Sequence, residues 1–210
     1  MSEGRVRMIG STWCRGFRGA VAGISMVCLA VGTAGAIDVE LNAAAVKKAV
    51  EDGKQMKEVK TLPTRFGADL AKDLCGGGGE IQTKTVGLNR LGALIAADPA
   101  RAERDKEKVD EAIKKTAEAN RLKIVFDFCG DTVDFADGSS ATIEQGGKMI
   151  KGETAKPDRA KKNEKGQAYR GKIAASFAYG AFDPKARTKI TLYPPMGDAM
   201  SWEVDFSTIR

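Results

Sequence analysis

The stretch Leu-Lys-Ile-Val-Phe-Asp-Phe at residues 122–128 decides the fold. Every second residue in it is large and apolar: Leu122, Ile124, Phe126 and Phe128. A period of two residues is typical of a β-strand, because successive side chains point to opposite faces of a sheet. The stretch therefore predicts a strand with one apolar face and one polar face.

The chain after this stretch carries more strand patterns. Further strands are indicated at Val133–Phe135, Ile173–Tyr179, Ile190–Leu192 and Trp202–Phe206. Ala141–Gln145 and Lys148–Lys151 flank the pair Gly146-Gly147, which accepts positive φ and so predicts a tight hairpin. We expect residues 121–210 to form an antiparallel sheet of five or six strands with one apolar face.

The chain before the stretch has helical periodicity instead. Helices are indicated at Asn42–Gly53, at Phe66 with Leu70 and Leu74, at Leu88–Ile95 and at Pro99–Asn120, with a short strand at Ile81–Thr85. The helix that begins at Phe66 is expected to stop at Cys75 and the glycines of residues 76–79. The predicted class is α+β, with three or four N-terminal helices packed on a C-terminal antiparallel sheet.

The first 36 residues have the pattern of a cleavable export signal. A basic start precedes the apolar stretch Ala20–Val31, and Ala34-Gly35-Ala36 fits an A-x-A cleavage site. We expect a mature chain that begins at Ile37, whether translation starts at Met1 or at Met8. The apolar stretch is shorter than the roughly 20 residues of a membrane helix, so no stable span is expected after cleavage.

The signal divides the chain into two parts. Residues 1–36 are the signal peptide, and residues 37–210 are expected to form one α+β domain, with a helical part at 37–120 and a β part at 121–210. An adjacent arginine pair is absent from the leader, which favours the general secretory route over the twin-arginine route. The expected location is the periplasm or the outside of the cell.

The cysteine and histidine contents limit the kinds of covalent bond, catalytic site and metal site that the chain can form. Cleavage would leave Cys75 and Cys129, which we expect to form a disulfide in an oxidising compartment. A redox-active pair is the alternative, although the C-x-x-C spacing is absent. The chain has no histidine, which excludes serine–histidine and cysteine–histidine nucleophiles and histidine-ligated metal sites. No cofactor is expected.

Three carboxylates suggest a weak metal site. Asp131, Asp134 and Asp137 follow one another closely, and calcium binds where several carboxylate oxygens converge. Their spacing does not match an EF-hand loop, and Asp137-Gly138 is a common turn pair. Solvated turn carboxylates are therefore the preferred interpretation, with a calcium site as the alternative.

The stretch Lys156–Lys172 is the most basic part of the mature chain. We expect a mobile surface loop at residues 152–171, and an anionic surface partner is the functional alternative. Nucleic acid is not expected as a partner of an exported chain. The glycines of residues 76–79 lack the Lys-Ser/Thr of a P-loop, so they do not indicate a phosphate site.

Other polar and aromatic residues fit no catalytic motif. Ser139, Ser140 and Ser176 could each pair with a lysine as a nucleophile, but none lies in a recognised pattern. Trp202, Phe177 and Tyr179 are expected in the core rather than around a ligand.

The sequence therefore predicts an exported, non-enzymatic protein that binds an envelope component, such as an envelope protein, or a ligand. The alternatives are an envelope hydrolase that uses carboxylates or serine and lysine, and a weak calcium-binding module. The sequence sets no oligomeric state.

Overall fold

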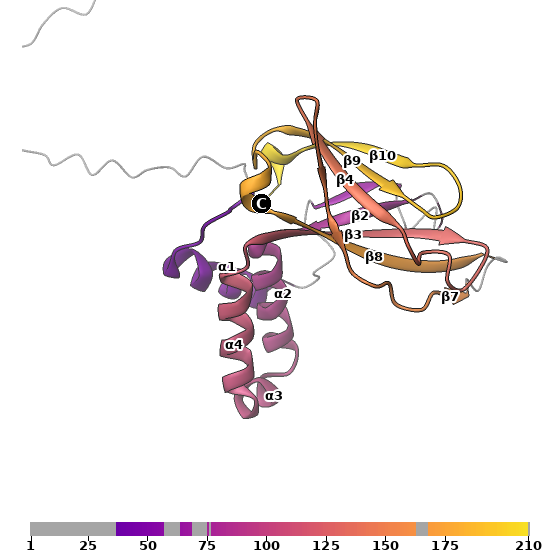
Figure 1. Cartoon of the computed structure of the whole chain (residues 1–210). Helices are drawn as coiled ribbons and strands as arrows, with labels where there is room; N and C mark the ends of the chain where they lie inside the picture. Colours follow the sequence, from indigo (N-terminus) through magenta and orange to yellow (C-terminus); the bar gives the residue numbers. More distant parts are fainter. Residues whose placement is uncertain (1–36, 57–63, 69–74, 76, 163–167, 210) are drawn as a thin grey trace, which may run out of the picture. The chain divides into compact units, whose positions relative to one another are not determined.

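The computed structural model describes residues 37–56, 64–68, 75, 77–162 and 168–209. All of these residues belong to one compact unit that spans Thr33–Arg210. The described residues form four α-helices and two antiparallel sheets, and the helices mostly precede the strands (Figure 1). The predicted α+β class is confirmed.

The alternating stretch lies in β3 (Arg121–Gly130), the central strand of the first sheet. The order of this sheet is β1-β2-β3-β8-β6, and β7 also pairs with β8. The other strands are β1 (Arg65–Gly67), β2 (Gly78–Gln82), β6 (Glu153–Thr154), β7 (Lys161–Lys162) and β8 (Tyr169–Ala178). In β3, Leu122, Ile124 and Phe126 are buried and Lys123 is exposed, as the two-residue period predicts.

The second sheet has the order β10-β9-β4-β5. Its strands are β4 (Ser140–Gln145), β5 (Lys148–Lys151), β9 (Arg187–Tyr193) and β10 (Met200–Asp205). β4 and β5 form the predicted hairpin, and Gly146 and Gly147 both have positive φ, at 55° and 80°. Positive φ at both central residues is the backbone of a type I′ turn, which explains the Gly-Gly pair.

A corner at Gly152 connects the two sheets. β5 pairs with β4 in the second sheet, and β6, which follows directly, pairs with β8 in the first. A Cβ atom on Gly152 would lie 2.7 Å from Cζ of Phe177. Only glycine therefore lets the chain pass this ring and change sheets.

The two sheets share one core. Ile124 and Phe126 of the first sheet and Ile143 and Ile190 of the second belong to a single buried cluster. Ile37 also belongs to it, with 2% of its surface exposed, and its backbone N–H donates to the carbonyl of Pro184 at 3.2 Å. One contiguous core explains why the strand patterns all have one apolar face.

The helices are α1 (Ala43–Gln55), α2 (Lys84–Ala97), α3 (Pro99–Arg104) and α4 (Lys106–Ala117). The side chains of Asn42, Thr83 and Asp98 cap the first three by accepting hydrogen bonds from backbone N–H groups. α1 and α2 pack closely where two glycines replace side chains. A Cβ atom on Gly53 would lie 2.1 Å from the carbonyl oxygen of Asn89, and one on Gly92 would lie 2.1 Å from that of Val50.

Some details of the sequence prediction are wrong. Phe66 lies in β1 rather than in a helix, and the predicted partners Leu70 and Leu74 lie outside the described residues. Gly78 and Gly79 begin β2, and β2 ends at Gln82 rather than at Thr85 because Thr83 caps α2.

The helix expected at Pro99–Asn120 is interrupted at Asp105, whose φ of −101° and ψ of 27° are not helical. Val133 and Phe135 lie in turns rather than in a strand. Phe135 still packs inward, in an edge-to-face contact with Phe128 at 4.8 Å between ring centroids.

The basic stretch is not simply a loop. β6 and β7 lie within residues 152–171, and both pair with β8. Ala160 between them is buried, and its N–H donates to the carbonyl of Val133 at 3.2 Å. The described part of this stretch is therefore anchored to the first sheet.

Candidate functional site

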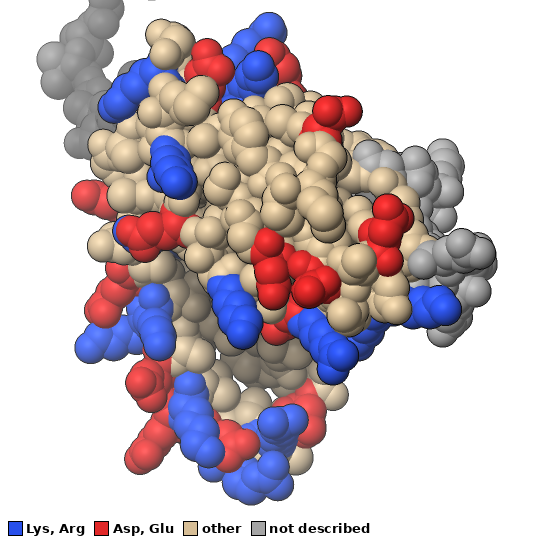
Figure 2. Space-filling model, turned by 45° about the vertical axis from the view of Figure 1, so that its right-hand side comes forward, with Lys and Arg blue, Asp and Glu red and all other residues tan. Residues whose placement is uncertain are grey.

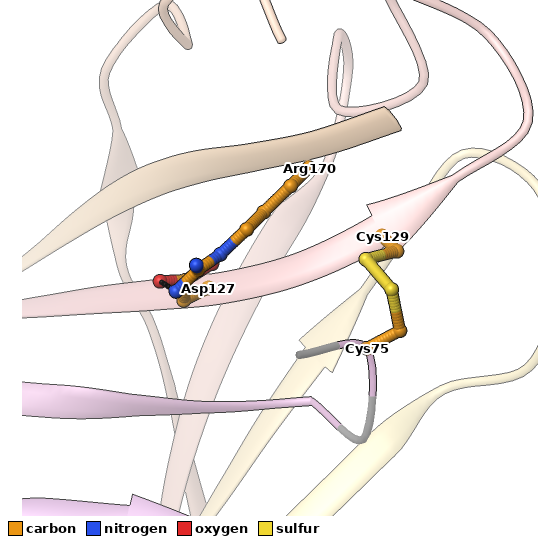
Figure 3. Close-up of a disulfide and its surroundings, with 4 residues drawn as sticks. All are labelled: Cys75, Asp127, Cys129 and Arg170. Atoms are coloured by element: carbon orange, nitrogen blue, oxygen red, sulfur yellow. Dashed lines mark hydrogen bonds and ion pairs between the residues drawn. A yellow bond between two sulfur atoms is a disulfide. The ribbon is translucent and has the colours of Figure 1, made fainter. Parts of the chain in front are cut away.

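The structure contains the disulfide that the sequence predicts. Cys75 and Cys129 are bonded, with their Cα atoms 5.1 Å apart, across a sequence separation of 54 residues. The bond ties the chain just before β2 to the end of β3 (Figure 3). The free-thiol alternative does not describe the state seen here.

Next to the disulfide, an arginine and an aspartate form an ion pair on the same face of the sheet. Arg170 lies opposite Cys129 in the β3–β8 register, and its side chain runs along the sheet to Asp127 (Figure 3). Its Nε and Nη2 atoms donate to the two carboxylate oxygens at 2.7 and 2.6 Å. Hydrogen bonding to Asp127 raises the pKa of Arg170, which keeps the guanidinium charged.

More cations lie on this face of the first sheet. Lys172 lies directly opposite Asp127, and its Nζ is 3.9 Å from Oδ2 of that carboxylate. Lys161 lies opposite Arg170, and residues directly opposite in an antiparallel pair share a face. Lys123 shares the face of Asp127 because the two are four residues apart in β3.

An arginine from β1 completes the set. Arg65 lies opposite Glu80, which lies opposite Val125, so these side chains share the face of Asp127. We call the five cations Arg65, Lys123, Lys161, Arg170 and Lys172 the basic face. The residues come from four strands, and the sequence analysis identified only the part within Lys156–Lys172. Nothing local in the sequence associates Arg65 or Lys123 with that stretch.

Three carboxylates of the described residues lie on this face, and each is paired with an arginine. The side chain of Asp127 is only 7% exposed and faces Arg170, whereas that of Lys172 is 64% exposed. Glu80 is 17% exposed and forms an ion pair with Arg90 of α2. Glu153 of β6 lies opposite Ser176, which lies opposite Lys123, and it forms an ion pair with Arg121 of β3. With Arg90 and Arg121 counted, seven cations and three carboxylates give a net charge of +4.

The basic face holds only a small hollow at its centre. The hollow among Arg65, Gly79, Glu80, Val125, Asp127 and Lys172 has a volume of about 20 Å³. A volume of this size holds about one water molecule.

The weak calcium candidates do not converge. Asp131, Asp134 and Asp137 are all exposed and lie in bends and turns between β3 and β4. Within residues 37–56, 64–68, 75, 77–162 and 168–209, no group of three or more acidic or cysteine side chains is arranged to hold a metal ion.

The serine candidates lie at two places in the fold. Ser139 is buried, Ser140 begins β4, and Ser176 lies on β8 directly opposite Lys123. The neighbours Ser176 and Lys123 are on an open strand face rather than in a cleft. A nucleophile and its base need a site that also holds a substrate, and these two do not line the hollow of the basic face.

The aromatic candidates fill the core. Phe177 and Tyr179 are 1% and 5% exposed, and burial raises the pKa of Tyr179 to about 12. Trp202 is half-buried, with its ring centroid 5.2 Å from that of Phe66 and 6.1 Å from that of Phe126. These three residues pack against other side chains, as the sequence analysis expects.

Sequence reasoning missed two apolar grooves on the helical part. α4 has no fully buried residue, and grooves of about 480 and 400 Å³ lie on either side of it. The first lies between α1 and α4, and the second is bounded by α2, α3 and α4. Leu94, in the second groove, is 67% exposed.

Charges on the helical part are mixed in sign. Figure 2 shows lysines and arginines interspersed with acidic residues at the lower end of the molecule, which holds α3 and the adjoining ends of α2 and α4. There Asp105 lies within 4.0 Å of Arg101, Arg104 and Lys108. Positive charge therefore does not predominate at this end, as it does on the basic face.

Comparison with known proteins assigns no family. No family model matches the chain, and no curated protein matches it. Among solved structures, the archaellum periplasmic stator protein FlaG from Sulfolobus acidocaldarius is similar over 41% of this chain and 88% of its own, with 11% sequence identity and a TM-score of 0.27. A similarity at this level supports no argument about function. None of the helices in the described residues has the length and apolar character needed to cross a membrane.

Proposed function

We propose that this chain is an exported, non-enzymatic protein that binds an anionic component of the cell envelope. The export part is supported by the leader pattern of residues 1–36 and by the disulfide between Cys75 and Cys129. Disulfides persist in oxidising compartments such as the periplasm and the exterior, and they are rare in the cytosol. The disulfide is therefore compatible with an exported protein.

The basic face is the observation that carries the binding part. An excess of positive charge on one exposed face is unfavourable for folding, because the cations repel one another, and it supports a role outside folding. Opposite charge on a partner would lower this repulsion. A partner with negative charge spread over its surface fits the basic face best.

Fractionation of the native host tests export. The protein from the envelope fraction is measured by intact mass, with and without reduction before thiol alkylation. We expect a chain that begins at Ile37 and that is alkylated only after reduction. An uncleaved chain with free thiols in the cytosolic fraction would contradict export.

Crosslinking in intact cells tests binding. We expect an envelope component to be crosslinked to the wild-type protein, and crosslinking to fall when Lys123, Lys161 and Lys172 are replaced by glutamine. Replacing the exposed lysines Lys47, Lys114 and Lys115 of α1 and α4 is the matched control, because it removes the same charge from the helical part. Equal crosslinking by both triple variants would contradict a role for the basic face.

A further inference from the structure

We infer that the basic face docks on an anionic phospholipid surface. The inference deepens the proposed function and rests on it, since the envelope lipids in question are reached by an exported chain. It names the partner as a lipid surface rather than a small phosphate-containing ligand.

The width of the basic face favours a surface over a single anion. Lys161 on β7 and Arg65 on β1 are separated by four steps between neighbouring strands. At about 4.8 Å per step, these two cations lie roughly 19 Å apart across the sheet. A single phosphate group contacts only donors that lie within a few ångströms of one another. Several phosphate groups in one plane, as in a layer of lipid headgroups, can contact all five cations of the basic face.

The small size of the hollow among the cations favours the same partner. Along this face Val125 lies opposite Ala174 and Gly78 lies opposite Asp127. The hollow there has a volume of about 20 Å³, enough for about one water molecule but not for a phosphate group. Cations that project from one sheet face can approach a layer of headgroups together.

Asp127 is negatively charged, but its position leaves the basic face suitable for an anionic partner. Its carboxylate is 7% exposed and lies beneath Arg170 and Lys172, of which the lysine is 64% exposed. A partner at the surface therefore meets the cations before the carboxylate. Asp127 is a positioning residue, because it holds the guanidinium of Arg170 along the face.

Cosedimentation with lipid vesicles tests the inference. The protein is purified as its host makes it, with the disulfide formed, and is mixed with vesicles of phosphatidylcholine alone or of phosphatidylcholine with phosphatidylglycerol. We expect binding only to the phosphatidylglycerol vesicles and a steep loss of binding as salt is added. Replacing Lys123, Lys161 and Lys172 by glutamine should weaken the partition about 100-fold, since each such cation contributes roughly a fivefold factor.

The matched control is the triple variant at Lys47, Lys114 and Lys115, which should bind nearly as well as the wild type. Both triple variants are checked for folding by circular dichroism. Equal loss of binding in the two variants, salt-independent binding, or no preference for phosphatidylglycerol would each overturn the inference. Because purified protein is used, the vesicle assay reports on the face alone, whereas fractionation reports on export alone.

Equilibrium dialysis with inorganic phosphate distinguishes the two possible ligands of the basic face, lipid headgroups and a soluble phosphate. We expect no saturable phosphate binding. Saturable binding that is lost in the Lys123, Lys161 and Lys172 variant, with no vesicle binding, would mean that the face holds a soluble anion and would overturn the lipid assignment.

Discussion

Replacing Gly92 by alanine tests a close backbone contact between α1 and α2. The added Cβ would lie 2.1 Å from the carbonyl oxygen of Val50 and 3.0 Å from the backbone nitrogen of Lys54. Both neighbours are backbone atoms of α1, so neither can turn away as a side chain does. To restore an ordinary contact of about 3.2 Å, α1 and α2 must separate by roughly 1 Å.

Two opposing effects decide whether Gly92→Ala raises or lowers the free energy of unfolding. Alanine is favoured over glycine within a helix by about 1 kcal/mol. Against this, overpacking costs typically about 1–3 kcal/mol, and separation by 1 Å weakens the packing of Val50 and Leu88, which form the core between the helices. We expect a net loss of about 2 kcal/mol, which lowers Tm by roughly 4–8 °C for a domain of this size.

Urea and thermal unfolding followed by circular dichroism measure this change. Gly87→Ala in the same helix is the control, because its Cβ would meet one side-chain atom, the methyl carbon of Thr116 at 2.8 Å, rather than the backbone of another helix. We expect Gly87→Ala to be close to neutral. A Gly92→Ala variant as stable as the wild type would refute the reasoning, since the propensity gain would then exceed the cost of the clash.

Three further predictions concern the first sheet and the core. Cys75→Ser should lower the free energy of unfolding in urea by about 4 kcal/mol, from the chain entropy of a 54-residue separation; an unchanged urea midpoint would contradict this. Asp127→Asn should lower the free energy of unfolding by about 2 kcal/mol, because the Arg170 guanidinium loses a charged partner. A double-mutant cycle with Arg170→Gln should show coupling between the two residues, and additive losses would contradict it. Burial raises the pKa of Tyr179 from its ordinary value of 10.0 to about 12, so its contribution to stability is present below about pH 10 and is lost as the pH rises towards 12. Tyr179→Phe should remove this alkaline loss in urea unfolding, and a loss that persists in the variant would assign it to another group.

The sequence predicts the parts of the fold whose pattern is local. The alternation in β3 and the Gly146-Gly147 turn depend on neighbouring residues, and both elements form where expected. The four-residue spacing that begins at Phe66 is misleading, because Phe66 instead pairs with Gly79 in β1–β2. A three-residue strand carries too few residues to show a period of its own.

The candidate site was only partly predictable for the same reason. The disulfide follows from the two cysteines that remain after the predicted cleavage, and the basic stretch follows from local composition. Arg65 and Lys123 join that stretch only through the registers of β1 with β2, β2 with β3 and β3 with β8. Registers between strands far apart in sequence are set by core packing, which a single sequence does not display.

The burial of Ile37 bears on the order of folding and leader removal. The residue that would become the N terminus after cleavage is already a core residue, 2% exposed and hydrogen-bonded to Pro184. A protease cuts a folded chain only through states in which the segment has opened. If the leader is removed before Ile37 as the sequence predicts, cleavage and completion of the core would compete in time, and a chain that folded first would be cleaved more slowly.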